Sequence, residues 1–228
     1  MRTPLAVLLT VAAGLAIATP AATAAPPPAS GCAQVDVITV RGTNEPQGGG
    51  TVVGPLASSI QASSSKTVSI EHLVYSASAV YPMSVPEGQT NLVNRVEAQA
   101  AACPSQQIVL TGYSLGAWVV GNALAGNGTF SNGRRISAAT GQRVAAIAQF
   151  GNPTFNSAES FDAGTYARGR NGSAGARPTG SLSTFASRIR DYCNARDNVC
   201  QTSGTLAPHL DYGKYRPDAT SFVVGRTG

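Results

Sequence analysis

Residue types that bind metal ions are scarce in this sequence. It has two histidines and four cysteines among 228 residues. The cysteines stand 71, 90 and 7 positions apart, at Cys32, Cys103, Cys193 and Cys200. Structural zinc sites usually contain a close ligand pair such as Cys-x-x-Cys, and no such pair is present. We therefore expect no metal site.

Long apolar runs are also missing after the first residues of the chain. A short basic start, an apolar run over 5–17 and an Ala-x-Ala sequence ending at Ala24 are typical of a secretory signal peptide. The run is too short for a membrane span, which needs about 20 apolar residues. The pattern predicts secretion without stable membrane insertion, with a signal peptide at 1–24, a Pro/Ala-rich leader at 25–31 and one domain at 32–228.

Charge is sparse, and most of the positive charge comes from arginine. Charged residues make up 12% of the chain, the formal net charge is +5, and 14 of the 16 basic residues are arginine. The arginines are scattered, without a long basic run and with few aromatic residues between them. Nucleic-acid-binding proteins gather such residues on one face. We interpret the positive charge as a solvated surface and expect no nucleic-acid partner.

Four cysteines in an exported chain indicate two disulfides, for which three pairings are possible. Cys193 and Cys200 are close enough in sequence to close a small loop. That pairing leaves Cys32 to pair with Cys103.

Short runs of β-forming residues alternate with helical patterns along the chain. Strands are predicted over 35–40, 68–74, 107–110 and 144–150, and helices over 52–62, 88–102 and 114–125. The last three strands are apolar on both faces, as expected where helices cover both sides of a parallel sheet. The order predicts a three-layer α/β sandwich around a mainly parallel sheet. The segment 154–180, rich in Gly, Ser, Arg and Asn, is interpreted as a functional rim or a mobile loop.

The sequence IVLTGYSLGAW, residues 108–118, places Ser114 between two glycines at the end of a predicted strand. The Gly-x-Ser-x-Gly pattern is weak by itself in a chain with 25 glycines, but its position between strand and helix matches a nucleophile elbow. A single residue at such a bend has a strained backbone, so Gly112 and Gly116 would prevent collisions. The serine oxygen would lie at a helix N-terminus, where free N–H groups stabilise an oxyanion. We predict that Ser114 is a nucleophile rather than a structural turn serine.

A serine nucleophile needs a base, and the chain offers His72 and His209. His72 lies in a strand-like run, where a packed histidine is the ordinary interpretation. His209 lies in a loop-like stretch late in the chain, and the order nucleophile, acid, histidine is the one that this elbow normally carries. The order favours His209 as the base.

The acid should lie between the serine and the histidine in sequence. The carboxylates in this interval that qualify are Glu159, Asp162, Asp191 and Asp197. Asp197 is favoured because a disulfide between Cys193 and Cys200 would hold its carboxylate in a fixed position. The alternative is a surface-loop aspartate.

Four short blocks, in this order, resemble the cutinase family of serine esterases, which includes acetylxylan esterases. They are Arg41-Gly-Thr-Asn-Glu-Pro46, Gly112-Tyr-Ser-Leu-Gly116, Cys193-x-x-x-Asp197-x-Val-Cys200 and His209-Leu-x-Tyr-Gly213. The resemblance covers about residues 32–215. It implies a catalytic triad of Ser114, Asp197 and His209, an oxyanion hole made by Thr43 and Leu115, and the disulfides Cys32–Cys103 and Cys193–Cys200.

The resemblance also implies a small lidless α/β-hydrolase with a shallow substrate groove, which Leu206 and Leu210 would line. The expected function is that of a secreted carboxylester hydrolase that cleaves aliphatic polyesters or short-to-medium acyl esters through an acyl-enzyme. The expected reaction needs no metal or organic cofactor, and we expect the protein to be a monomer. Two alternatives stay open: an acetylxylan esterase on the same fold, and a catalytically silent protein that binds a polymer or cell wall.

Overall fold

The computed structural model describes residues 31–228, so the predicted signal peptide and nearly all of the predicted leader lie outside the described residues. The described strands are β1 Val35–Val40, β2 Val68–His72, β3 Gln107–Tyr113, β4 Val144–Phe150, β5 Asp162–Gly164 and β6 Ile189–Cys193. They form one six-stranded sheet in the order β2-β1-β3-β4-β6-β5, and every neighbouring pair is parallel.

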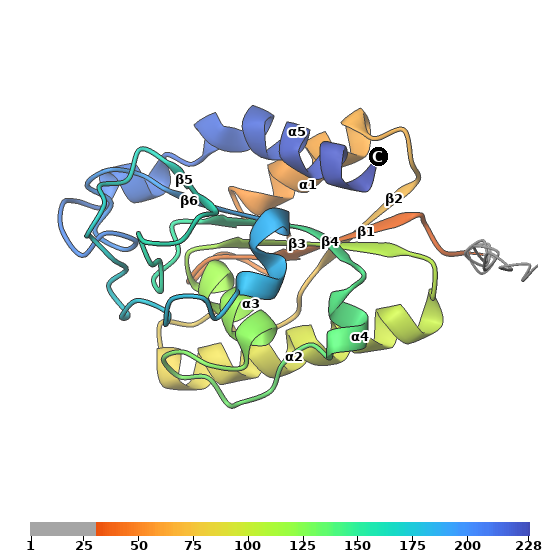
Figure 1. Ribbon diagram of the computed structural model, residues 1–228, viewed down its shortest axis with the longest axis horizontal. Helices are drawn as coiled ribbons and strands as arrows, with labels where there is room; N and C mark the ends of the chain where they lie inside the picture. Colours follow the sequence, from red (N-terminus) through yellow and green to blue (C-terminus); the bar gives the residue numbers. More distant parts are fainter. Residues whose placement is uncertain (1–30) are drawn as a thin grey trace, which may run out of the picture.

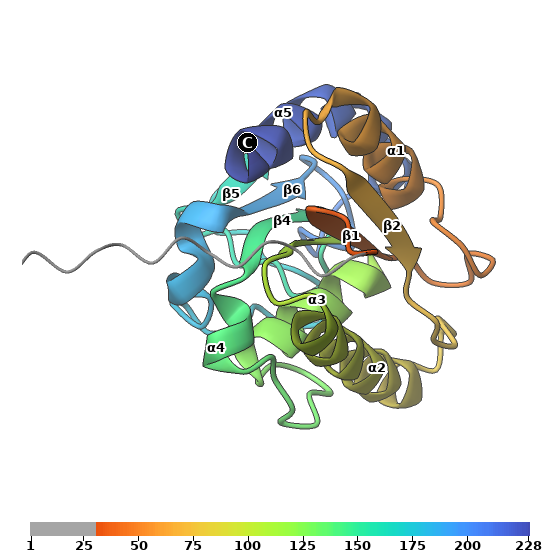
Figure 2. The ribbon, with the colours of Figure 1, turned by 90° about the vertical axis from the view of Figure 1, so that its right-hand side faces the viewer.

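Helices cover both faces of this sheet. They are α1 Val53–Ser63, α2 Tyr81–Ala102, α3 Leu115–Ala125, α4 Ala138–Gly141 and α5 Arg216–Thr227, with short 3₁₀-helices at Ser183–Arg188, Ala207–Leu210 and Gly213–Tyr215. Helices α1 and α5 lie on one side of the sheet, and α2, α3 and α4 lie on the other (Figures 1 and 2). The predicted three-layer α/β architecture is confirmed.

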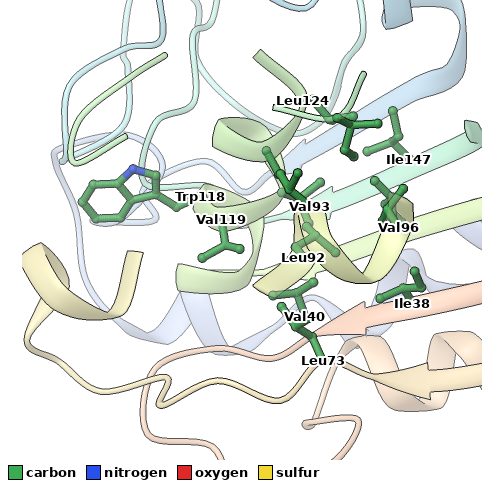
Figure 3. Packing of buried hydrophobic residues seen from close by; sticks show 14 of the residues in the cluster. Ile38, Val40, Leu73, Leu92, Val93, Val96, Trp118, Val119, Leu124 and Ile147 are labelled. Atoms are coloured by element: carbon green, nitrogen blue, oxygen red, sulfur yellow. The ribbon is translucent and has the colours of Figure 1, made fainter. Parts of the chain in front are cut away.

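The two sides of the sheet bury separate hydrophobic clusters, because successive residues of a strand point to opposite faces. In β1, Ile38 and Val40 pack under α2 and α3, whereas Val35 and Val37 pack under α1 and α5. Figure 3 shows the first cluster, with Trp118 at its edge and pointing away from the other labelled side chains. Both clusters are apolar, which explains why the strands are apolar on both faces.

Most predicted elements are present, with shifted ends. Strand β3 runs three residues beyond the predicted 107–110, up to the residue before Ser114, and β2 ends two residues before the predicted end at 74. Helix α2 begins at Tyr81 instead of 88. Pro82 is compatible with its first turn, where the missing N–H has no intrahelical partner to lose, and Pro86 lies inside the helix. The segment 154–180 contains β5 and is otherwise irregular.

Both disulfides have the predicted pairing. Cys32 is bonded to Cys103, and Cys193 to Cys200, each with its Cα atoms 5.9 Å apart. The first ties the start of β1 to the end of α2, and the second closes a loop directly after β6. None of the helices within residues 31–228 is long and apolar enough to cross a membrane.

The chain reverses its direction across the sheet between β1 and β3, which pair with each other while β2 lies outside β1. Ligands of open parallel sheets bind at such a switch point, outside the carboxyl ends of the strands. Thr43 follows β1 and Ser114 follows β3, so both stand at this position. The topology thus places the predicted nucleophile where a ligand site is expected.

Candidate active site

Ser114 occupies a strained bend between β3 and α3. Its backbone is in the left-handed half of conformational space, with φ 53° and ψ −119°, which is rare for a residue with a side chain. A Cβ at Gly112 would lie 2.6 Å from the carbonyl oxygen of Gly116, and a Cβ at Gly116 would overlap the carbonyl oxygen of Val40. Both glycines are therefore required by the close packing of α3 on β3 and β1, as predicted.

Ser114, His209 and Asp197 are joined by hydrogen bonds. His209 Nε2 is 2.9 Å from Ser114 Oγ, and His209 Nδ1 is 2.9 Å from Asp197 Oδ2. Asp197 is fully buried and His209 is buried. Ser114 and His209 are 95 positions apart in sequence, and Asp197 and His209 are 12 apart, yet the three side chains form one chain of hydrogen bonds along which a proton can move.

The carboxylate of Asp197 is held by four donors. Oδ1 accepts the backbone N–H groups of Val199 at 2.7 Å and Cys200 at 3.4 Å. Oδ2 accepts the Tyr212 hydroxyl at 2.6 Å in addition to His209. Burial opposes ionisation, but the hydrogen bonds from His209 and Tyr212 outweigh it and lower the pKa of Asp197 below its ordinary value. The acid is therefore an oriented carboxylate at neutral pH.

The imidazole of His209 is enclosed by tightly packed neighbours. The ring of Tyr113 stacks on it with centroids 5.2 Å apart, and the Tyr113 hydroxyl donates to the His209 carbonyl at 2.9 Å. Gly151 has φ 58°, and a Cβ there would lie 2.7 Å from the imidazole Cε1. A side chain at position 151 would therefore collide with the imidazole, so glycine is required there.

Two backbone N–H groups near Ser114 are candidates for the predicted oxyanion hole. Leu115 is the first residue of α3, so its N–H has no partner inside the helix. Thr43 lines the same cavity as Ser114 and Leu115, and neither its N–H nor its hydroxyl makes a hydrogen bond within the described part of the chain. Arg41 braces this loop by donating to the carbonyl oxygens of Glu45 at 2.8 Å and Tyr75 at 2.6 Å.

A cavity of about 340 Å³ opens next to Ser114. Its lining is mainly apolar and consists of Thr43, Tyr81, Ser114, Leu115, Trp118, Thr129, Phe130, Pro153, Ser173, Ala174 and Val199. Pro153, Ser173 and Ala174 lie in or next to the segment 154–180, so this segment contributes to the rim. Leu206 and Leu210 are exposed and do not line this cavity, so their contact with substrate stays a prediction.

Other residues that the sequence offered as the base or the acid make different contacts. His72 Nδ1 is 2.7 Å from the Thr39 hydroxyl on the neighbouring strand, and Asp191 accepts from Asn152. Sequence reasoning did not assign a role to Tyr212, Tyr113 or Phe130. For Tyr212 a signal existed, since it belongs to the block that begins at His209.

A strained serine at a helix N-terminus, bonded to a buried histidine–aspartate pair on a parallel α/β sheet, defines a serine hydrolase of the α/β type. The family model described as Cutinase matches residues 31–227. The chain belongs to the cutinase family, and this membership makes it a serine ester hydrolase of cutinase type.

Several curated proteins are similar to the chain. A cutinase of Kineococcus radiotolerans is 35% identical over 201 residues, which cover 86% of this chain and 63% of that protein, so the chain spans less than two thirds of that relative. A probable carboxylesterase of Mycobacterium tuberculosis, Culp3, is 32% identical over 97% of this chain and 77% of its own length. Acetylxylan esterase 2 of Talaromyces purpureogenus is 30% identical over 86% of this chain and 88% of its own length.

Solved structures agree with this assignment. An acetylxylan esterase structure at 0.90 Å resolution superimposes with a TM-score of 0.78 and 28% identity, covering 86% of this chain and all of that one. Trichoderma reesei cutinase in complex with a phosphonate inhibitor has a TM-score of 0.63 and 26% identity, covering 86% of this chain and 78% of that one. The folds of these similar structures thus agree with the family to which the family model assigns the chain.

Proposed function

We propose that Ser114, His209 and Asp197 hydrolyse carboxylic esters as nucleophile, general base and orienting acid. The substrates are aliphatic polyesters or short-to-medium acyl esters. One observation carries this proposal: two hydrogen bonds of 2.9 Å connect Asp197 through His209 to a serine at the N-terminus of α3. A general base must lie within hydrogen-bond reach of the proton that it removes, and His209 does.

The reaction begins when Ser114 Oγ attacks the ester carbonyl carbon and its proton passes to His209 Nε2. The carbonyl oxygen becomes an oxyanion beside the N–H groups of Thr43 and Leu115, where each donor contributes about 3 kcal/mol to transition-state stabilisation. His209 then gives its proton to the leaving alcohol as the carbon–oxygen bond breaks, and an acyl-enzyme remains.

Deacylation repeats these steps with water. His209 takes a proton from water, the water oxygen attacks the acyl carbon, and the proton returns to Ser114 as the acid leaves. Asp197 stays ionised throughout, fixes the Nδ1–H tautomer of His209 and stabilises the imidazolium. This sequence of steps uses no metal or organic cofactor.

An acetylxylan esterase is the second candidate, because acetylxylan esterases are among both the curated relatives and the structural neighbours. The third candidate, a catalytically silent binding protein, would not explain why a buried Asp–His pair is hydrogen-bonded to Ser114.

We also propose secretion, which the two disulfides support because such bonds persist in oxidising compartments. A monomer without a nucleic-acid partner stays a prediction.

The test of the proposed function compares the two histidines and the serine. We expect Ser114→Ala to abolish labelling by a fluorophosphonate, and Ser114→Ala and His209→Ala to lower p-nitrophenyl butyrate turnover by at least about 10⁴-fold. His72→Ala is the matched control and should keep both labelling and turnover. Turnover that survives in Ser114→Ala would refute the assignment of the nucleophile. Release of acetate from acetylated xylan without any release of monomers from cutin would favour the second candidate.

A further inference from the structure

Three aromatic side chains border the cavity next to Ser114. Trp118 lies one helical turn after Ser114, its ring centroid 5.6 Å from that of Phe130 in a stacked arrangement and 5.8 Å from that of Tyr81. Trp118 is nearly buried, whereas Phe130 is 42% exposed and Tyr81 37% exposed. The group forms an apolar wall that is partly open to solvent within one turn of the nucleophile.

The cavity opens on one side of Ser114. It is lined by Ser114 and by both proposed oxyanion residues, Thr43 and Leu115, and His209 is not part of its lining. In the proposed mechanism His209 protonates the leaving alcohol, so the alcohol lies toward the imidazole. With the carbonyl oxygen beside Thr43 and Leu115, the acyl group extends into the cavity, toward Trp118 and Phe130.

Phe130 is held in this position at an energetic cost. Its φ is 55°, a left-handed conformation that is unfavourable for a bulky residue, and such strain persists where the surroundings enforce it. The preceding residue supplies that enforcement: the carbonyl of Thr129 accepts from Trp118 Nε1 at 2.9 Å and Asn122 Nδ2 at 3.1 Å, and the Thr129 hydroxyl donates to the Ala174 carbonyl at 2.8 Å. These hydrogen bonds hold the backbone next to Phe130, and its ring stacks on Trp118 at the cavity wall.

We propose that Phe130, stacked on Trp118, forms the wall of an acyl pocket that selects acyl groups longer than acetyl. This inference rests on the proposed function and specifies its acyl side. The cavity volume of about 340 Å³ corresponds to roughly eleven times the space of one water molecule in the liquid. An acetyl group would leave most of this apolar surface uncovered, whereas each further methylene would bury part of it.

The experiment measures kcat/KM for p-nitrophenyl acetate, butyrate and hexanoate. For the wild type we expect a rise of about fourfold per added methylene, which corresponds to about 0.8 kcal/mol per buried methylene. The main variant is Phe130→Gly, because glycine removes the ring and accepts the positive φ without strain, so the fold is preserved. Phe130→Asn is a second variant compatible with this backbone. Val74→Ala, an exposed apolar residue outside the cavity lining, is the control.

Both Phe130 variants should lower hexanoate turnover about tenfold and change acetate turnover less than about threefold, so that the length dependence flattens. Val74→Ala should keep the wild-type profile. An equal loss on acetate and hexanoate, or a wild type that prefers acetate, would overturn the acyl pocket while leaving ester hydrolysis by Ser114 intact. Hydrolysis of none of the esters would instead overturn the proposed function, and this inference with it.

Discussion

The hydroxyl of Tyr212 donates a 2.6 Å hydrogen bond to Asp197 Oδ2, the same oxygen that accepts from His209 Nδ1. Tyr212 is fully buried, and its oxygen accepts the backbone N–H of Asn194 at 3.1 Å. The tyrosine proton therefore points at the carboxylate. Tyr212 is a positioning residue. Its hydroxyl holds the Asp197 carboxylate in place, and the negative charge of that carboxylate is divided between the hydrogen bonds from Tyr212 and His209.

Replacing Tyr212 with phenylalanine should change the pH dependence of the reaction. Without the hydroxyl, more of the Asp197 charge faces His209 and stabilises its protonated form, so the acid limb of the kcat/KM profile moves to higher pH. A hydrogen bond to a charged group contributes about 1.5–3 kcal/mol, and one pH unit corresponds to about 1.4 kcal/mol, so a shift of about one to two units is expected. The measurement is kcat/KM for p-nitrophenyl butyrate between pH 4 and 9.

The matched control is Tyr215→Phe, which removes a nearby hydroxyl that donates to Asn194 Oδ1 at 2.8 Å and does not touch the carboxylate. Its profile should coincide with that of the wild type. A Tyr212→Phe profile that falls in height without moving along the pH axis would show a merely structural role.

Removing each of the two disulfides should change Tm and kcat differently, because the disulfides close loops of very different length. Cys32–Cys103 spans 71 residues and Cys193–Cys200 spans seven. A longer loop restricts the unfolded chain more, and loss of a native disulfide typically costs 2–5 kcal/mol. Cys32→Ser/Cys103→Ser should therefore lower Tm most and leave kcat nearly unchanged.

Cys193→Ser/Cys200→Ser should instead lower kcat by about tenfold or more, since this loop carries Asp197 and misplacement by about 1 Å can cost a hundredfold. Thermal melts and kcat on p-nitrophenyl butyrate, measured below the lower Tm, separate the two effects. Equal kcat values in the two double variants would contradict the role assigned to the short disulfide.

Local chemistry explains why Ser114, Asp197 and His209 could be predicted from the sequence. The glycines beside Ser114 answer a steric demand of a strand–helix bend, and the cysteines around Asp197 mark a short closed loop. Strand β6 was missed because Arg190 and Asp191 interrupt its apolar pattern. Helix α5 was missed although Pro217 and Asp218 lie in its first turn, as is typical of helix starts.

The cavity wall could not be predicted in the same way. Trp118 belongs to an apolar helix and has the pattern of a core residue, and Phe130 lies in a polar, glycine-containing loop. The exposure of Phe130 depends on its left-handed backbone, next to which Thr129 is held by hydrogen bonds with α3 and with Ala174. Leu206 and Leu210, the apolar residues near His209 in sequence, are exposed and lie outside this cavity lining, and their contact with substrate stays a prediction.

A buried acidic pair at the edge of the sheet should make stability depend on pH. Asp162 on β5 is paired in register with Asp191 on β6. Burial raises the pKa of Asp162 to about 8, with a further contribution from Asp191, and burial raises the pKa of Asp191 to about 7. Both oxygens of Asp162 and Oδ1 of Asp191 lack hydrogen-bond partners within residues 31–228. The two carboxyl groups are thus held in a site that favours their protonated forms.

The folded state therefore binds more protons than the unfolded state between about pH 4, where free carboxyl groups titrate, and about pH 8. The stability that these groups contribute is fully present below about pH 4 and is lost as pH rises through the folded pKa values. Asp162→Asn removes one ionisation, so its Tm should exceed that of the wild type by several degrees at pH 9 and differ little at pH 4. Asp211→Asn, at an exposed carboxylate, should show no such divergence. A Tm gain of equal size at both pH values would mean that the asparagine acts through new hydrogen bonds and not through the lost charge.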